Sequence, residues 1–207
     1  AGKLAEGRAW RERLGRPVLL LASTREGEEA MLLGALGAAP SEVLVALVPR
    51  HPQRFDEVAA QAAKDGFQVS RRSRGATPRP EDRIFLGDTM GEMDFYYAAA
   101  DVAVIGGSFQ PLGGQNLIEA CAAGAAVVLG PSMFNFAEAA RLALEAGAAV
   151  RAGGAREAIS AALSLLDDPA RRAQMGEAGR RLCEAHRGAT ARHLAACAKL
   201  LTARAPG

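Results

Sequence analysis

A glycine-rich loop carries the residues with the clearest chemical meaning. Two diglycines, Gly106-Gly107 and Gly113-Gly114, bracket the loop, which follows an apolar run and precedes a helical pattern. Glycines in such a place let the backbone approach a ligand and direct amide groups at an anion. Asn116 can donate to a phosphate oxygen, and Glu119, one helical turn along, can accept from ribose hydroxyls. The segment fits a nucleotide site, and it fits equally a tight turn with a helix cap.

Two hydroxyls and a cation follow another apolar run. Ser23, Thr24 and Arg25 come directly after residues 18–22 and suit an anion. Helix capping is an alternative explanation, because three glutamates follow within residues 26–29 and would repel a phosphate unless they face away. This segment is therefore a candidate anion site with a structural alternative.

Two further loops add binding groups. Arg50 stands between Pro49 and His51 after the apolar run 43–48. Prolines on both sides fix the backbone, so that the cation projects in a set direction; a solvated arginine is the plain alternative. Residues 88–93 combine a glycine with a helix start, where main-chain groups can read the edge of a base.

Apolar runs alternate with helical patterns along most of the chain. Strands are predicted at residues 18–22, 43–48, 67–69, 84–86, 102–105, 126–129 and 148–150, and helices at 30–36, 55–64, 90–100, 116–123, 136–145 and from 157 onward. Breaks in the last helical region are predicted at 168–169 and 187–188. Such alternation predicts a doubly wound parallel sheet of the α/β class with a helical tail. Because ligands bind outside the carboxyl ends of such strands, the candidate residues should meet at one edge.

Composition narrows the class of protein. A chain of 207 residues, with 49% hydrophobic and 23% charged residues, predicts one globular domain. The net charge of +2 does not favour a nucleic-acid partner. Cys121, Cys183 and Cys197 lack the spacing of a disulfide framework or a zinc site. No P-loop, G-x-G-x-x-G, G-x-S-x-G or H-E-x-x-H motif occurs, which disfavours several enzyme classes. Residues 71–80 are basic and rich in glycine and proline, which predicts an exposed, mobile loop.

Six ordered blocks give the sequence a family resemblance. They are residues 22–29 (ASTREGEE), 48–55 (VPRHPQRF), 90–93 (MGEM), 106–109 (GGSF), 113–119 (GGQNLIE) and 130–136 (GPSMFNF). In this order they resemble the 3-deoxy-D-manno-octulosonic acid (Kdo) transferases. The resemblance covers roughly residues 10 to 150 by motif, and the helical remainder is similar in character to the end of that family's second domain.

The resemblance implies a two-domain GT-B glycosyltransferase, of which residues 1–207 would be the single carboxyl-terminal, donor-binding domain with a Rossmann-like fold. The amino-terminal acceptor domain would be absent from this chain. The implied reaction moves Kdo from CMP-Kdo to the lipid A precursor in lipopolysaccharide biosynthesis, with inversion and without a metal or cofactor. The family acts at the cytoplasmic face of the inner membrane of Gram-negative bacteria. Its catalytic glutamate and membrane anchor belong to the other half, so no catalytic residue is expected here, and the chain alone should be soluble and inactive.

The resemblance also implies roles for particular residues. The cytosine pocket would be lined by Pro49, Arg50 and main-chain groups of Gly91, Glu92 and Met93. Glu119 would hold the ribose, and the phosphate would be held by Ser108, Asn116 and the amides near Gly107 and Gly114. Ser23 and Thr24 would flank the phosphate or the Kdo, and Arg25 would face the Kdo carboxylate.

Two positions depart from the family pattern. Arg25 and Gln115 stand where many members have histidine, so any proton transfer assigned to those histidines is in doubt here. Two other readings remain open from the sequence. The chain is alternatively another GT-B enzyme, such as a UDP-sugar transferase or an epimerase, which would prefer UDP to CMP. A non-catalytic Rossmann-like interaction domain would bind no nucleotide.

Overall fold

Seven parallel strands form one sheet in the computed structural model, which describes residues 2–75 and 77–186. The strands are β1 Val18–Thr24, β2 Leu44–Pro49, β3 Val69–Arg71, β4 Ile84–Leu86, β5 Val102–Ile105, β6 Ala126–Leu129 and β7 Ala149–Arg151. Their order across the sheet is β3-β4-β2-β1-β5-β6-β7, and each pairing is parallel. The predicted doubly wound α/β sheet is confirmed, and its strand order reverses between β1 and β5.

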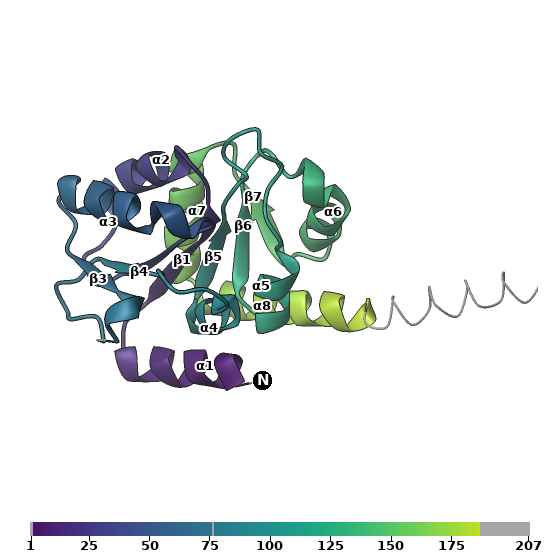
Figure 1. Cartoon of the computed structure of the whole chain (residues 1–207). Coiled ribbons are helices and arrows are strands. Elements are labelled where there is room, and N and C mark those ends of the chain that lie inside the picture. Colours follow the sequence, from purple (N-terminus) through teal and green to yellow (C-terminus); the bar gives the residue numbers. More distant parts are fainter. Residues whose placement is uncertain (1, 76, 187–207) are drawn as a thin grey trace, which may run out of the picture.

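Helices cover both faces of the sheet (Figure 1). They are α1 Gly2–Leu14, α2 Glu28–Ala35, α3 Phe55–Lys64, α4 Met93–Ala99, α5 Ile118–Ala123, α6 Ala137–Glu145, α7 Ala155–Leu166 and α8 Pro169–Ala185, with short 3-10 turns η1 Leu36–Ala38, η2 Pro52–Arg54, η3 Arg72–Arg74 and η4 Phe134–Phe136. The helices α2, α3 and α7 bury side chains on one face, and α1, α4, α5 and α6 bury theirs on the other.

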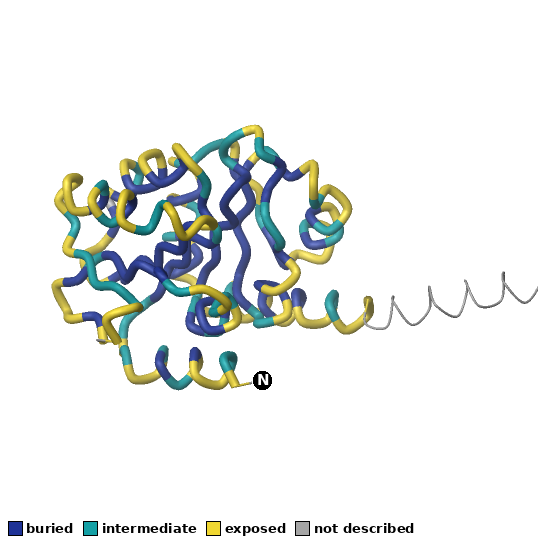
Figure 2. Tube along the Cα trace, in the orientation of Figure 1, coloured by how far each residue is buried: buried dark blue, intermediate teal, exposed yellow. Residues whose placement is uncertain are grey.

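The central strand β1 shows why the sequence signal is a continuous apolar run. Val18 and Leu20 enter one core cluster, Leu19 and Leu21 enter the other, and all four are fully buried. Consecutive side chains of a strand point to opposite faces, so a sheet covered on both faces needs apolar residues at every position. Figure 2 shows the central strands as the buried centre of the molecule, whereas the edge strands β3 and β7 are less buried.

The first helix, α1, was not predicted from the sequence. Only Gly7 and Trp10 are buried in it, which leaves no apolar stripe of helical period for a sequence pattern to reveal. Trp10 stacks on Phe85 with ring centroids 5.2 Å apart and meets Phe95 edge-on at 5.5 Å. Two buried residues are enough to anchor the helix because α4 offers an aromatic surface.

Several predicted boundaries are corrected. The strand expected at 67–69 lies at Val69–Arg71, and the helix expected from residue 116 begins at Ile118. The helix expected from residue 90 begins at Met93, because Gly91 adopts a left-handed φ of 73°. The exposed loop predicted at 71–80 is wrong at its start, where Arg71 and Arg72 keep only 23% and 20% of their side chains exposed.

The predicted helical tail is present as α7 and α8. The expected break between them is confirmed: Pro169 begins α8, and the side chain of Asp168 accepts a hydrogen bond from the Arg171 amide at 2.9 Å. The break predicted at 187–188 and Cys197 lie outside the described residues. Within residues 2–75 and 77–186, the helices are too short or too polar to cross a membrane.

Candidate functional site

Two adjoining hollows lie where the carboxyl ends of the central strands meet. The first, called the Met90 hollow, encloses about 60 Å³ and is lined by Ser23, Val48, Pro49, Arg50, Phe55, residues 89–93 and Tyr96. The second, called the Glu119 hollow, encloses about 260 Å³ and is lined by Ser23, Arg50, Met93, Tyr97, Gln115, Asn116 and Glu119. Ser23, Arg50 and Met93 line both. The predicted position of the site, beyond the strand ends, agrees with this geometry.

Ser23 sits at the junction of the hollows in an unusual backbone conformation. Its φ of 54° makes it the one described residue other than glycine with a positive φ. The pairing of β1 with β2 shifts register between Ala22 and Thr24, and a Cβ on Gly106 would clash with the Ser23 carbonyl. The hydroxyl of Ser23 lies 4.0 Å from the sulfur of Met93, a weak contact that leaves it able to bind a ligand.

Thr24 and Arg25 do not join the hollows. The Thr24 side chain is buried and donates to Glu29 Oε1 at 2.8 Å; that Thr24 flanks the phosphate or the Kdo stays a prediction. The side chain of Arg25 is half-buried, and Arg25 is not among the described residues that line either hollow. Its backbone amide donates to Glu28 Oε2 at 2.8 Å. Capping by Ser23 or Thr24, the alternative considered for this segment, is wrong, because the N-cap residue of α2 is Gly27 and it has no side-chain cap hydrogen bond within the described residues.

Arg50 provides the cation of the site. Its amide donates to the Thr24 carbonyl at 2.9 Å, which ties the end of β2 to the end of β1. Pro49 before it is buried, whereas the Arg50 side chain is exposed and forms no ion pair within the described residues. The predicted combination of a fixed backbone and a projecting guanidinium is therefore present.

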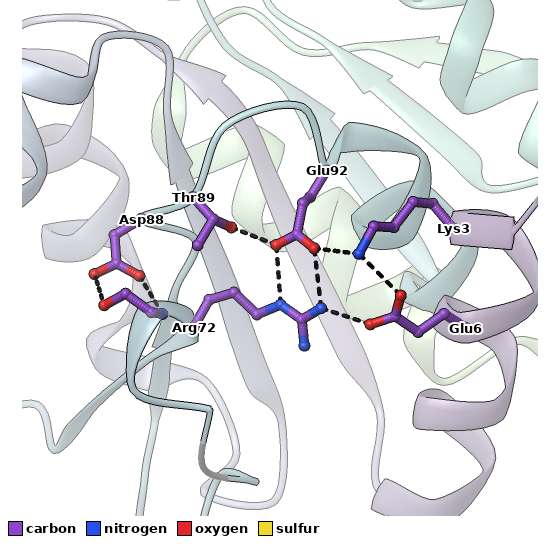
Figure 3. Close-up of polar contacts among 7 residues, drawn as sticks. Lys3, Glu6, Arg72, Asp88, Thr89 and Glu92 are labelled. Carbon is purple, nitrogen blue, oxygen red and sulfur yellow. Dashed lines mark hydrogen bonds and ion pairs between the residues drawn. The ribbon is translucent and has the colours of Figure 1, made fainter.

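The loop before α4 is held from behind by charged residues (Figure 3). The Glu92 carboxylate accepts hydrogen bonds from Lys3 Nζ at 2.6 Å and from the Nε and Nη2 atoms of Arg72, each at 3.0 Å, as well as from the Thr89 hydroxyl. The hydrogen bonds from Arg72 are the main reason why the pKa of Glu92 falls to about 2. The Glu92 side chain is thus fully engaged, and the predicted contribution of this loop rests on its main chain.

Asp88 anchors the other end of that loop. Its carboxylate is buried and accepts hydrogen bonds from Arg71 Nε at 2.6 Å, the Ser73 amide at 2.8 Å and the Ser73 hydroxyl at 2.6 Å. Burial alone would raise the pKa of Asp88, but the hydrogen bonds from Ser73 and Arg71 lower it below its usual value. Residues predicted as an exposed loop therefore support the wall of the Met90 hollow.

Several groups of the glycine-rich loop bond within the protein. The amide of Gly107 donates to Glu28 Oε2 at 2.6 Å, and the amide of Gly114 donates to the Gly107 carbonyl at 2.7 Å. Ser108 is fully buried; its hydroxyl donates to the Ile105 carbonyl at 2.5 Å and accepts from the Gly130 amide at 2.9 Å. These groups have partners within the protein, and the phosphate contacts predicted for Ser108 and for the amides near Gly107 and Gly114 stay predictions.

Asn116 and Glu119 line the Glu119 hollow together, as predicted. Asn116 Nδ2 donates to Glu119 Oε1 at 3.1 Å, while Asn116 Oδ1 accepts from the Ile118 amide at 3.0 Å. The Tyr97 hydroxyl donates to the Asn116 carbonyl at 3.3 Å. Asn116 thus bonds the first amide of α5, although the N-cap residue is Leu117, and one Asn116 amide hydrogen and one exposed Glu119 oxygen remain for a ligand.

Sequence reasoning missed three kinds of residue in this site. Tyr96 and Tyr97 line the hollows from within α4, where their only signal was an apolar helix face. The sequence predicted Arg72 as part of an exposed loop, because its partner Glu92 lies 20 residues further along the chain. Glu28 has a local signal, a carboxylate three residues after the amide that it caps, but its contact with Gly107 spans 79 residues.

The sequence is similar to a family of glycosyl transferases and to individual enzymes. Residues 76–182 match the family model of the glycosyl transferases group 1. The 3-deoxy-D-manno-octulosonic acid transferase of Bordetella pertussis is 57% identical over 199 residues, or 93% of this chain and 46% of that protein. The enzyme of the same name from Haemophilus influenzae is 37% identical over 183 residues, or 86% of this chain and 43% of that protein. The chain thus spans less than half the length of these relatives.

A solved structure resembles the fold closely. It is described as the C-terminal CMP-Kdo binding domain of WaaA from Acinetobacter baumannii, and it superposes with a TM-score of 0.82 at 28% identity. The match covers 87% of this chain and 97% of that one. The family resemblance predicted from the six sequence blocks is confirmed by these relatives.

Proposed function

The chain belongs to the group 1 glycosyl transferases, and from this premise we propose that it is the donor-binding domain of a Kdo transferase, with CMP-Kdo as the donor. The observation that carries the proposal is the identity of 57% with the Bordetella pertussis enzyme over nearly the whole chain. The paired hollows at the strand-order reversal support it, because open α/β sheets bind nucleotides at this point.

The shapes of the hollows suggest how the nucleotide binds. The small, mostly apolar Met90 hollow suits the cytosine ring, with Pro49, Phe55 and the main chain of residues 91–93 around it. The Glu119 hollow suits the ribose and the phosphate, since Glu119 can accept from ribose hydroxyls. Arg50 lines both hollows and reaches toward the junction of sugar and phosphate.

The proposed chemistry is stabilisation of a leaving group. As the bond between Kdo and CMP breaks, negative charge grows on the CMP phosphate. The Arg50 backbone and the Asn116 side chain are held by hydrogen bonds before the donor binds, so that the Arg50 guanidinium projects from a fixed point and both groups can stabilise that charge. In this proposal, no metal takes part and the sugar is inverted.

The acceptor side lies outside the chain. The relatives are more than twice as long as their matched part, so we place the acceptor site, the catalytic base and any membrane contact in another domain. The names of the relatives imply the rest of the proposal. The acceptor is the lipid A precursor at the inner membrane of Gram-negative bacteria, and the reaction belongs to lipopolysaccharide biosynthesis. Residues 1–207 then act as the donor half of a two-domain enzyme and give no product alone.

Calorimetric titration of the chain with CMP, UMP, AMP and NAD tests the proposal. We expect binding that is selective for CMP and that is strongly weakened by Glu119→Ala, because that change removes the ribose acceptor. A preference for UMP would point to a UDP-sugar enzyme and contradict the proposed donor. If no nucleotide bound, and a full-length relative also bound none, the loops would be structural and the proposal would fail.

A further inference from the structure

A buried acid beneath the glycine-rich loop has no part in the function proposed above. Glu28, the first residue of α2, is fully buried. Its Oε2 accepts hydrogen bonds from the amides of Gly107 at 2.6 Å and Arg25 at 2.8 Å, and its Oε1 accepts from the Phe109 amide at 2.9 Å. Three amides from two loops thus converge on one carboxylate, which is the way in which backbone nests enclose an anion.

On the basis of the proposed function, we propose that Glu28 is a positioning residue for the donor phosphate. Its carboxylate acts as a built-in anion that fills the amide nest of residues 106–109 and fixes the shape of the glycine-rich loop. The phosphate then binds outside this nest, on side chains that face the Glu119 hollow. This assigns different tasks to the loop and to the side chains of the site.

Charge and hydrogen bonding both support this division. A phosphate in the same nest would bring a second negative charge against a carboxylate that has no contact with solvent, and the two would repel. Without the carboxylate, the buried Gly107 amide would lose its acceptor, which is costly. Ser23, Arg50, Gln115 and Asn116 line the Glu119 hollow and have donors still to offer.

A hydrogen bond within the glycine-rich loop connects Gly107, which Glu28 holds, to the residues that face the phosphate. The Gly107 carbonyl accepts from the Gly114 amide at 2.7 Å, and Gly114 lies two residues before Asn116. Gly107 has a left-handed φ of 67°, so its conformation is not fixed by ordinary backbone preference. A shift of Gly107 therefore moves Asn116 relative to the hollow.

The neighbouring Glu29 provides a matched control. It is also buried, at 2% exposure, and its Oε1 accepts from the Thr24 hydroxyl and from Arg54 Nη1, both at 2.8 Å. Glu29 has the same side chain on the same helical turn, but its hydrogen bonds do not reach the glycine-rich loop. A general loss of stability would affect both positions alike.

The test compares CMP with cytidine, which lacks the phosphate, in Glu28→Gln and Glu29→Gln. A glutamine at 28 turns an NH₂ group toward one of the three amides and breaks that contact. We expect Glu28→Gln to weaken CMP about tenfold and cytidine less than twofold, while Glu29→Gln leaves the ratio of the two affinities within twofold. Equal weakening of both ligands by Glu28→Gln, or no weakening, would overturn the proposal.

Amide hydrogen exchange on the unmodified chain gives a test that needs no variant. We expect the Gly107 and Phe109 amides to be protected before CMP is added, and no further protected afterwards. Protection that develops only with CMP would identify the phosphate as their acceptor and refute the role of Glu28. If neither this chain nor a full-length relative bound CMP, the proposed function would fail instead, while exchange without nucleotide would still test the contact with Glu28.

Discussion

Two groups of charged and polar residues border the same pair of hollows and are used in opposite ways. Behind the Met90 hollow, Lys3, Glu6, Arg72 and Glu92 bind one another; we call them the back cluster. Around the Glu119 hollow, Arg50, Asn116 and Glu119 form the front group, in which Arg50 has no ion pair within the described residues. Arginine and glutamate occur in both groups, so residue type alone does not reveal which group serves structure.

The difference lies in how many hydrogen-bonding positions remain open. Arg72 forms a bidentate pair with Glu92, donates to Glu6 at 2.6 Å and lies over the Phe95 ring at 4.3 Å from its centroid. The hydrogen bonds to Glu92 and, next, to Glu6 raise the pKa of Arg72, and the hydrogen bonds from Arg72 lower the pKa of Glu92, so both partners are charged at neutral pH. The back cluster therefore stabilises the loop, whereas the front group keeps donors and acceptors for a ligand.

The sharpest way to test this contrast is Arg72→Ala. The change leaves the mostly buried Glu92 carboxylate, at 12% exposure, without its main partner and removes the cation from the Phe95 ring. We expect the free energy of unfolding to fall by about 3 kcal/mol, at the lower end for a broken buried pair because Lys3 remains. Urea denaturation monitored by circular dichroism measures it.

Arg141→Ala is the control for Arg72→Ala. Arg141 pairs with Glu138 and Glu145 on the exposed surface of α6, where solvent screens the charges. We expect almost no change in the urea midpoint. Similar losses for both variants would mean that the back cluster contributes no more than a surface pair.

Arg50→Ala tests the front group. Removing a cation without a protein partner should leave the free energy of unfolding within about 0.5 kcal/mol of the original. The affinity for CMP should fall roughly thirtyfold, because a charge-assisted contact with the phosphate is lost. Calorimetry measures the affinity, and His51→Ala, an exposed neighbour outside both described hollow linings, should leave it unchanged. A loss of stability instead of affinity would place Arg50 with the back cluster.

Glu119→Gln sharpens the assignment within the front group. If Glu119 accepts from the ribose, the substitution should weaken CMP roughly fivefold to tenfold, since one strong acceptor is replaced by a weaker one. The affinity for 2′-deoxy-CMP should change much less if the 2′-hydroxyl is the partner. An equal effect on both nucleotides would move the contact of Glu119 away from that hydroxyl.

The fold was predictable because its signals are local and repeated. Strands buried on both faces appear as continuous apolar runs, and glycines and prolines mark the loops that follow them. The strand ends therefore identified Arg50, Asn116 and Glu119 correctly as neighbours in space. Helix α1 escaped because two buried residues produce no periodic pattern.

The inward-facing polar residues could not be predicted in the same way. Thr24 and Ser108 have the residue types of a phosphate site, but both bond within the protein, as does the Glu28 carboxylate. Whether such a group faces a ligand or a loop depends on contacts between distant segments, such as the 79 residues between Glu28 and Gly107. A local sequence pattern does not show which distant segment a side chain will contact.

Arg25→Ala has the smallest expected effect and tests the boundary of the front group. The side chain is half-buried and contributes to neither hollow among the described residues, so CMP affinity should change less than twofold. The Glu28 contact uses the Arg25 backbone amide, which survives the substitution. Titration with CMP and then with CMP-Kdo separates two possibilities for this cation. If the affinity for CMP-Kdo falls and the affinity for CMP does not, Arg25 binds the sugar carboxylate. If the affinity for CMP itself falls, Arg25 belongs to the front group, which contradicts the division drawn here.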